Sequence, residues 1–136
     1  MKALVFDKSK YDWYSSRGFE EAEVPEPVLD EKNNPEDKKS VVVKVLYAGV
    51  CGTDRSLWYR RSFGDYIEKS LEAEGKNYRI IGHELAGEII DLGSEVQDEF
   101  DLKTRDFVSA DSHVVCNNCF QCRNGQKNVC VNEQIL

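Results

Sequence analysis

Residues 40–50 read SVVVKVLYAGV, and this stretch is the clearest indication of how the chain folds. Its valines, leucine and tyrosine have the β-branched and aromatic character that extended strands favour. A continuous apolar run of this length is typical of a buried strand. Cys51 follows the run directly, so the sequence predicts a thiol where a buried strand gives way to a turn.

Further strands are predicted on both sides of this run. Residues 2–6 form a short apolar segment, and residues 19–24 set Phe, Ala and Val among glutamates until Pro25 ends the pattern. Residues 79–92 and 107–115 also have strand composition. At least five strands separated by turn residues predict a mainly β fold with few helices, an antiparallel barrel or sandwich.

One clear helix is predicted after the cysteine at position 51. Its apolar residues recur three or four positions apart along one stripe, and they are Phe63, Tyr66, Ile67 and Leu71. Gly75 is suited to end such a helix. The helix is expected to cover the domain, although a stripe of this kind also serves as a lid or a subunit contact.

Length and charge exclude several classes of protein. The 136 residues correspond to one domain or to a piece of one. The net charge of −7 makes the chain a poor partner for nucleic acid. The longest aliphatic run, residues 41–43, is too short to span a membrane, and the N-terminal apolar run is too short for a secretion signal. The polar residues 30–39 are expected to form a solvated loop. We therefore expect a cytoplasmic protein with no nucleic-acid and no membrane partner.

Four of the five cysteines stand in CNNCFQCRNGQKNVC, residues 116–130, with the spacing C-x2-C-x2-C-x7-C. They are Cys116, Cys119, Cys122 and Cys130. Four thiolates can close a tetrahedral shell around zinc with bonds of about 2.3 Å, and a closed shell leaves no position for substrate. The spacing therefore predicts a structural zinc lobe at about residues 112–132. Arg123 and Lys127 would offset part of the thiolate charge.

Other uses of these thiols stay open. An iron–sulfur cluster also takes closely spaced cysteines, but the bacterial ferredoxin run has a last gap of three and a following proline, and neither feature is present here. Disulfides conflict with the missing secretion signal and with the crowding of the first three cysteines. A redox or metal-storage protein would use the same thiols.

The fifth cysteine, Cys51, and His83 each lie at the end of a predicted strand. A thiolate and an imidazole suit zinc, and a catalytic zinc takes three protein ligands and keeps one position open. From the residues alone, a buried thiol and a hydrogen-bonded histidine are the more common outcome. Similarly, Thr53 and Asp54 are good N-cap residues, so capping a helix that starts after Cys51 is an alternative to a functional role for them. For Glu84 the alternative is an ordinary acidic side chain at the surface.

Three segments occur in order along the chain: CGTD at 51–54, GHELAGEIIDLGSEV at 82–96, and the four-cysteine stretch. Together they resemble the medium-chain zinc-dependent alcohol dehydrogenase family over most of the chain. Residues 111–136 are most similar to its threonine 3-dehydrogenase branch. The resemblance implies that residues 1–136 are an incomplete GroES-like catalytic domain. Such a domain is a partly open β-barrel with a zinc-binding lobe, truncated here before the Rossmann domain.

The resemblance also implies residue roles. Cys51 and His83 would ligate a catalytic zinc, and Glu84 would lie close to the metal and ligate it transiently. Thr53 would take the proton of the substrate into a relay, and Asp54 would orient a ligand. The four clustered cysteines would hold a second, structural zinc.

The implied reaction is the oxidation of a small alcohol, polyol or amino alcohol, in which zinc polarises a secondary alcohol and hydride passes to NAD(P). Ser56 stands where the family often has a histidine, and a hydroxyl does not titrate near neutral pH. Arg55 is shared with the glucose dehydrogenase branch, so a glucose- or sorbitol-type substrate is an alternative. The family's Gly-Asp before a strand is Arg105-Asp106 here, after a loop (VQDEFDLKT) longer than usual.

A nicotinamide-binding half is expected outside this stretch. The nine glycines contain no G-x-G-x-x-G fingerprint, and the third ligand of the catalytic zinc would lie beyond Leu136. We therefore expect the isolated chain to be inactive, and the full-length enzyme to be a homo-oligomer that includes a Rossmann domain. A stand-alone, non-catalytic zinc-binding β module is the alternative.

Overall fold

The computed structural model describes residues 1–135, with side chains at all of these positions except 97–99 and 134–135. The chain divides into two compact units. The first unit comprises Met1–Asp30 and Val50–Gly82, and the second comprises Glu31–Gly49 and His83–Leu136. Each unit is built around its own small antiparallel sheet.

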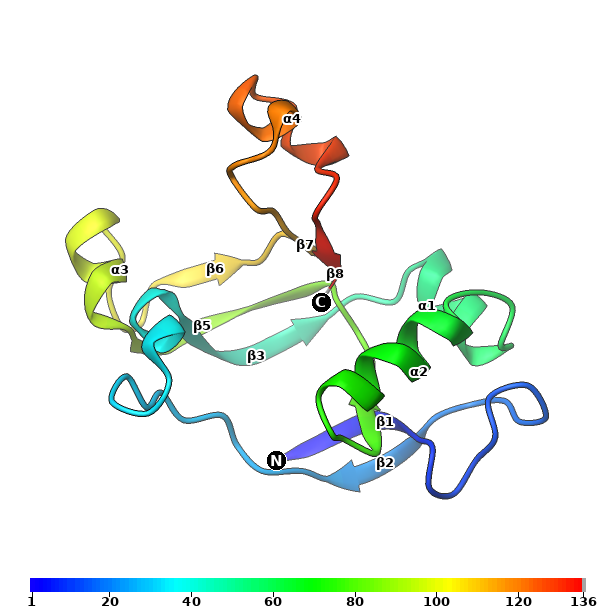
Figure 1. Cartoon of the computed structure of the whole chain (residues 1–136). Helices are drawn as coiled ribbons and strands as arrows, with labels where there is room; N and C mark the ends of the chain where they lie inside the picture. Colours follow the sequence, from blue (N-terminus) through cyan, green and yellow to red (C-terminus); the bar gives the residue numbers. More distant parts are fainter. Residues whose placement is uncertain (136) are drawn as a thin grey trace. The chain divides into compact units, whose positions relative to one another are not determined.

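The central strand of the first unit is β1 (Lys2–Asp7), which lies between β2 (Glu20–Glu23) and β4 (Tyr78–Ile80) (Figure 1). Both pairings are antiparallel. The strands predicted at 2–6 and 19–24 are thereby confirmed.

The predicted amphipathic helix is also present, as α2 (Gly64–Ala73). Two residues of the predicted stripe, Ile67 and Leu71, are buried, whereas Phe63 and Tyr66 are exposed. Phe63 precedes the helix with a φ of 66°, so its side chain does not continue the helical stripe. A shorter helix, α1 (Gly52–Trp58), comes before α2 in the same unit.

Aromatic and aliphatic side chains fill the core of the first unit. Its members are Phe6, Trp13, Leu57, Ile67 and Leu71, with Phe19 and Ile81 packed against them. Arg60 stacks on this core: its guanidinium carbon lies 4.9 Å from the ring centre of Phe6 and 4.7 Å from that of Trp13. The guanidinium also donates to the carbonyl oxygens of Leu57 at 2.7 Å and Gly18 at 2.6 Å. Arg60 therefore joins the aromatic core to the chain segments around it.

We expect Arg60→Ala to lower the free energy of unfolding by about 3 kcal/mol, because two carbonyls lose a charged donor and the rings lose a stacked cation. Arg61→Ala is the matched control. Arg61 is exposed and stacks on Tyr59 alone among the described ring contacts, so its loss should change stability by about 0.5 kcal/mol or less. Urea unfolding of both variants measures the difference, and equal losses would contradict a special role for Arg60.

The central strand of the second unit is β5 (Leu85–Leu92), which lies between β3 (Val41–Ala48) and β6 (Phe107–Ser109). Both pairings are antiparallel. A separate two-stranded pairing joins β7 (His113–Val114) to β8 (Gln134–Ile135). The sheets are open, which agrees with the predicted mainly β, partly open architecture.

The strand composition at residues 79–92 is confirmed but is divided between two strands, whereas the single strand predicted at residues 107–115 is wrong in extent because it is split. Residues 79–92 form β4 in the first unit and β5 in the second. Between them Gly82 has a φ of 117°, a conformation that side-chain-bearing residues rarely adopt. Residues 107–115 form β6 and β7, with residues 110–112 between them.

The prediction that residues 40–50 are buried is also wrong for much of β3. Val42 is buried, but Val45 and Tyr47 are 51% and 69% exposed. β3 is an edge strand, and its register with β5 shifts twice, between Val42 and Val43 and between Val45 and Tyr47. Such shifts change which side chains face a given side of the sheet, so a run of apolar letters need not be buried throughout.

The described part of the second unit also contains four short helices. They are η1 (Pro35–Lys39), α3 (Ser94–Glu99), α4 (Phe120–Arg123) and η2 (Lys127–Val129). The polar stretch 30–39, predicted to be wholly a loop, thus contains a helical turn, and α3 occupies part of the loop predicted before Arg105.

The carboxylate of Glu31 fixes the start of α3. It accepts hydrogen bonds from the backbone N–H of Ser94 at 2.7 Å and from the Ser94 hydroxyl at 2.8 Å. Val96 of α3 then packs with Ile89 and Leu92 in the core of the second unit. None of the described helices has both the length and the apolar character needed to cross a membrane.

Candidate metal centres

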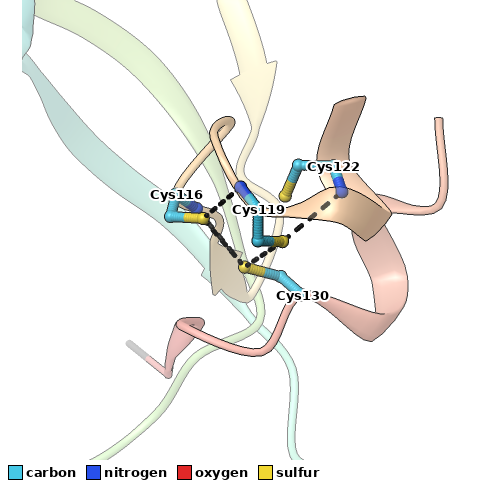
Figure 2. A group of neighbouring side chains, drawn as sticks. All are labelled: Cys116, Cys119, Cys122 and Cys130. Carbon is cyan, nitrogen blue, oxygen red and sulfur yellow. Dashed lines mark hydrogen bonds between the residues drawn. The ribbon is translucent and has the colours of Figure 1, made fainter. Parts of the chain in front are cut away.

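Four cysteine sulfurs meet in the lobe that follows β7. The Sγ atoms of Cys116, Cys119, Cys122 and Cys130 lie within 4.8 Å of one another, and Figure 2 shows the four side chains gathered around one point. The Sγ of Cys130 is 3.6 Å from that of Cys116 and 3.9 Å from that of Cys119. A regular tetrahedron with metal–sulfur bonds of about 2.3 Å has sulfur–sulfur edges of about 3.8 Å. The spacing of the sulfurs therefore fits a zinc ion.

Backbone N–H groups of the lobe point at the sulfurs. The N–H of Cys119 donates to the Sγ of Cys116 at 3.3 Å, and the N–H of Cys122 donates to the Sγ of Cys119 at 3.5 Å, at the start of α4 (Figure 2). The N–H of Cys116 donates to the Sγ of Cys130 at 3.5 Å. None of the four lobe cysteines forms a disulfide bond. The lobe thus offers thiol groups already surrounded by the donors that stabilise a thiolate.

These surroundings move the pKa values of the thiols in opposite directions. The N–H groups of Asn118 and Cys119 lower the pKa of Cys116 to about 6, and those of Cys122 and Val131 lower the pKa of Cys119. Burial raises the pKa of Cys122 to about 12. A cysteine binds a metal ion as its thiolate. A divalent cation bound here would therefore displace the proton of the Cys122 thiol.

Cys51 lies at the start of α1 in the first unit. Its Sγ accepts the N–H of Thr53 at 3.2 Å, and its own N–H donates to the carboxylate of Asp54 at 2.8 Å. The Cys51 side chain also accepts the backbone N–H of Asp54, so Cys51 and Asp54 form a capping box in which Cys51 is the N-cap. The alternative that Thr53 and Asp54 serve as N-caps is therefore wrong in detail, although a helix does begin here and Asp54 does support its start. Asp54 is buried and holds the backbone that carries the Cys51 thiol.

His83 and Glu84 line a cavity of about 480 Å³ in the second unit. Its other lining residues are Tyr47, Gly49, Leu85, Ala86, Ser109, Ala110, Asp111 and Ser112. Gly49 donates its N–H to the carbonyl oxygen of Glu84 at 2.8 Å. A Cβ on Gly49 would lie 2.9 Å from the Cβ of Glu84 and closer still to its carboxylate, so the absence of a side chain leaves room for Glu84. The cavity has the size of a small-molecule site.

The predicted catalytic residues thus belong to both units of the chain. Cys51, Thr53 and Asp54 are held together in the first unit, and His83 and Glu84 are held together in the second. Sequence reasoning missed the polar wall of the cavity at residues 109–112. Residues 109–112 lie inside the stretch predicted to be one strand, 107–115, so the sequence carried no signal that they leave the strand to line a cavity.

Comparison with known proteins gives the family. Residues 37–136 match the alcohol dehydrogenase GroES-like domain. The chain is 37% identical over 134 residues to the L-threonine 3-dehydrogenase of Cutibacterium acnes, which covers 98% of this chain and 32% of that enzyme. The chain therefore belongs to the zinc-dependent alcohol dehydrogenase family, and the GroES-like fold predicted from the sequence is confirmed.

Solved structures agree with this assignment. Galactitol-1-phosphate dehydrogenase from Escherichia coli is 25% identical with a TM-score of 0.69, over 100% of this chain and 32% of that one. An alcohol dehydrogenase from Escherichia coli CFT073, solved in complex with the cofactor NADH, is 28% identical with a TM-score of 0.64, again over 100% and 32%. The chain spans about a third of the length of the relatives it matches.

Proposed function

We propose that this chain is the catalytic-domain portion of a zinc-dependent, NAD(P)-linked alcohol dehydrogenase of the threonine 3-dehydrogenase type. The observation that carries the proposal is the match to a threonine 3-dehydrogenase over 98% of the chain. The motifs CGTD and GHE and the four-cysteine lobe all lie within that matched length. The proposed substrate is a small secondary alcohol. The similarity to L-threonine 3-dehydrogenase favours an amino alcohol over a sugar or a polyol as that substrate.

The structural zinc belongs to Cys116, Cys119, Cys122 and Cys130. The sulfur–sulfur separations of 3.6 and 3.9 Å support this assignment, as do the backbone donors at the sulfurs. The lobe, at about residues 112–132, has few buried apolar residues of its own. The bound ion would therefore stabilise it in the way that a hydrophobic core stabilises a larger domain.

The catalytic zinc is assigned to Cys51, His83 and Glu84, with a further ligand outside these residues. When bound, such an ion polarises the hydroxyl of an alcohol and favours loss of its proton. Asp54 orients the Cys51 backbone through its 2.8 Å bond and thereby sets the direction of the thiol. The hydroxyl of Thr53 receives the substrate proton and passes it toward solvent, where Ser56 takes the place of a titrating histidine.

The cavity beside His83 supplies the space for the substrate. Tyr47, Leu85 and Ala86 give it apolar walls, and Ser109, Asp111 and Ser112 give it polar ones. The hydride acceptor is a nicotinamide, which a Rossmann domain outside these residues would hold. In this proposal the full-length enzyme is a cytoplasmic homo-oligomer, and residues 1–136 without that domain are inactive.

A chimaera tests the proposed function. Residues 1–136 replace the matching segment of the Cutibacterium acnes enzyme, which then supplies the nicotinamide-binding part. We expect NADH to form from NAD⁺ with L-threonine at a rate at least tenfold above that with sorbitol or glucose, because the cavity beside His83 comes from this chain. A preference for sorbitol or glucose would favour the other substrate class. A folded, zinc-loaded chimaera with no turnover on any of the three would favour a non-catalytic zinc-binding module.

A further inference from the structure

We propose that Asn132 is a positioning residue of the four-cysteine site, which donates hydrogen bonds to two of the four sulfurs and thereby tightens zinc binding. The inference rests on the zinc site proposed above and adds a residue to it.

Asn132 reaches two sulfurs at once. Its backbone N–H donates to the Sγ of Cys130 at 3.4 Å, and its side-chain Nδ2 donates to the Sγ of Cys116 at 3.7 Å. The two sulfurs are themselves 3.6 Å apart. One residue therefore spans one edge of the sulfur tetrahedron from outside.

The chemistry of the two groups fixes the direction of the side-chain bond. A thiolate only accepts hydrogen bonds, and within the amide of Asn132 only the nitrogen donates. Four thiolates around one divalent cation leave an excess of negative charge, and donors to the sulfurs reduce it. Among the described hydrogen bonds to the four sulfurs, the other nitrogen donors are backbone groups, so a change at this side chain removes one donor and leaves the loop backbone intact.

Removing an outer partner of a metal ligand lowers metal affinity by about 10- to 100-fold. We expect Asn132→Ala to raise the Kd for zinc at this site by about tenfold, because it removes the Nδ2 donor alone. Asn132→Asp keeps the shape but faces the Cys116 sulfur with a second anion, so its Kd should rise by about 100-fold.

Asn124 provides the matched control. It lies in the same lobe and is also exposed, but its Nδ2 donates to the carbonyl oxygen of Phe120 at 2.7 Å and not to a sulfur. Asn124→Ala should therefore change the Kd for zinc by about twofold or less. Circular dichroism of each zinc-loaded variant checks that the fold is retained.

The experiment is a competition for zinc between the 136-residue chain and a coloured chelator, with cobalt substitution as a second readout. Cobalt bound by four thiolates gives sulfur-to-metal charge-transfer absorption, which Asn132→Ala should shift and Asn124→Ala should not. If the wild type binds zinc tightly and Asn132→Ala binds it equally well, the inference is overturned while the zinc site stands. Equal losses in both alanine variants would also overturn it, since the effect would then be a general loosening of the lobe. A wild type that binds no zinc would remove the site and the inference together.

Discussion

Replacing Gly87 with alanine is expected to lower the free energy of unfolding by about 3 kcal/mol. Gly87 is buried in β5, the central strand of its sheet, opposite Val45 of β3. A Cβ at this position would lie 2.8 Å from the Cγ1 of Val43 and would collide with the carbonyl oxygen of Lys44. Because the obstacle is backbone, no side-chain rotation relieves it, and the two strands would have to separate.

Gly52→Ala is the control for Gly87→Ala. A Cβ at Gly52 meets nothing within 4 Å, and the residue is in the first turn of α1. Alanine there should leave stability unchanged or raise it by up to about 1 kcal/mol. Urea unfolding in the presence of zinc compares the two variants. A Gly87→Ala chain as stable as the wild type would mean that β3 and β5 are not packed as closely as described.

Replacing Cys119 with serine is expected to remove about one zinc ion per chain and to loosen the lobe around it. Exchange of amide hydrogens in residues 116–132 should become faster by about tenfold or more, because the lobe depends on the ion in place of a core. Metal analysis and hydrogen exchange measure the two effects on the same sample.

Cys51→Ser is the matched control for the cysteine change. It should also cost about one zinc ion, but exchange within residues 116–132 should stay as in the wild type, since Cys51 belongs to the first unit. The proposal of separate structural and catalytic zinc sites predicts this contrast. Identical exchange profiles for the two variants would argue against it.

Local patterns predicted the parts of the fold that depend on neighbours in sequence. The period of apolar residues identified α2, and alternation bounded by Pro25 identified β2. The spacing of the four cysteines likewise predicted a shared site, because short loops of this kind can turn several sulfurs toward one ion. The structure brings those sulfurs together as expected.

Other features depend on contacts between distant segments and were not predicted. The burial of β3 is set by its place at a sheet edge and by two register shifts, neither of which its valines reveal. The division of residues 79–92 depends on the φ of Gly82, which a glycine permits but does not require. Asn132 and the wall at residues 109–112 were overlooked because nothing in their immediate sequence marks them as neighbours of a sulfur or a cavity.

The exposed edge strand β3 has a consequence for the behaviour of the chain in solution. A long apolar edge offers N–H and C=O groups to any other extended strand, and Lys44 is the charged side chain within β3 that discourages such pairing. The net charge of −7 keeps separate molecules apart through mutual repulsion. Dissolved salt weakens that repulsion but leaves the apolar edge unchanged. Self-association of the chain should therefore increase with ionic strength, which is the opposite of what an association between opposite charges would do.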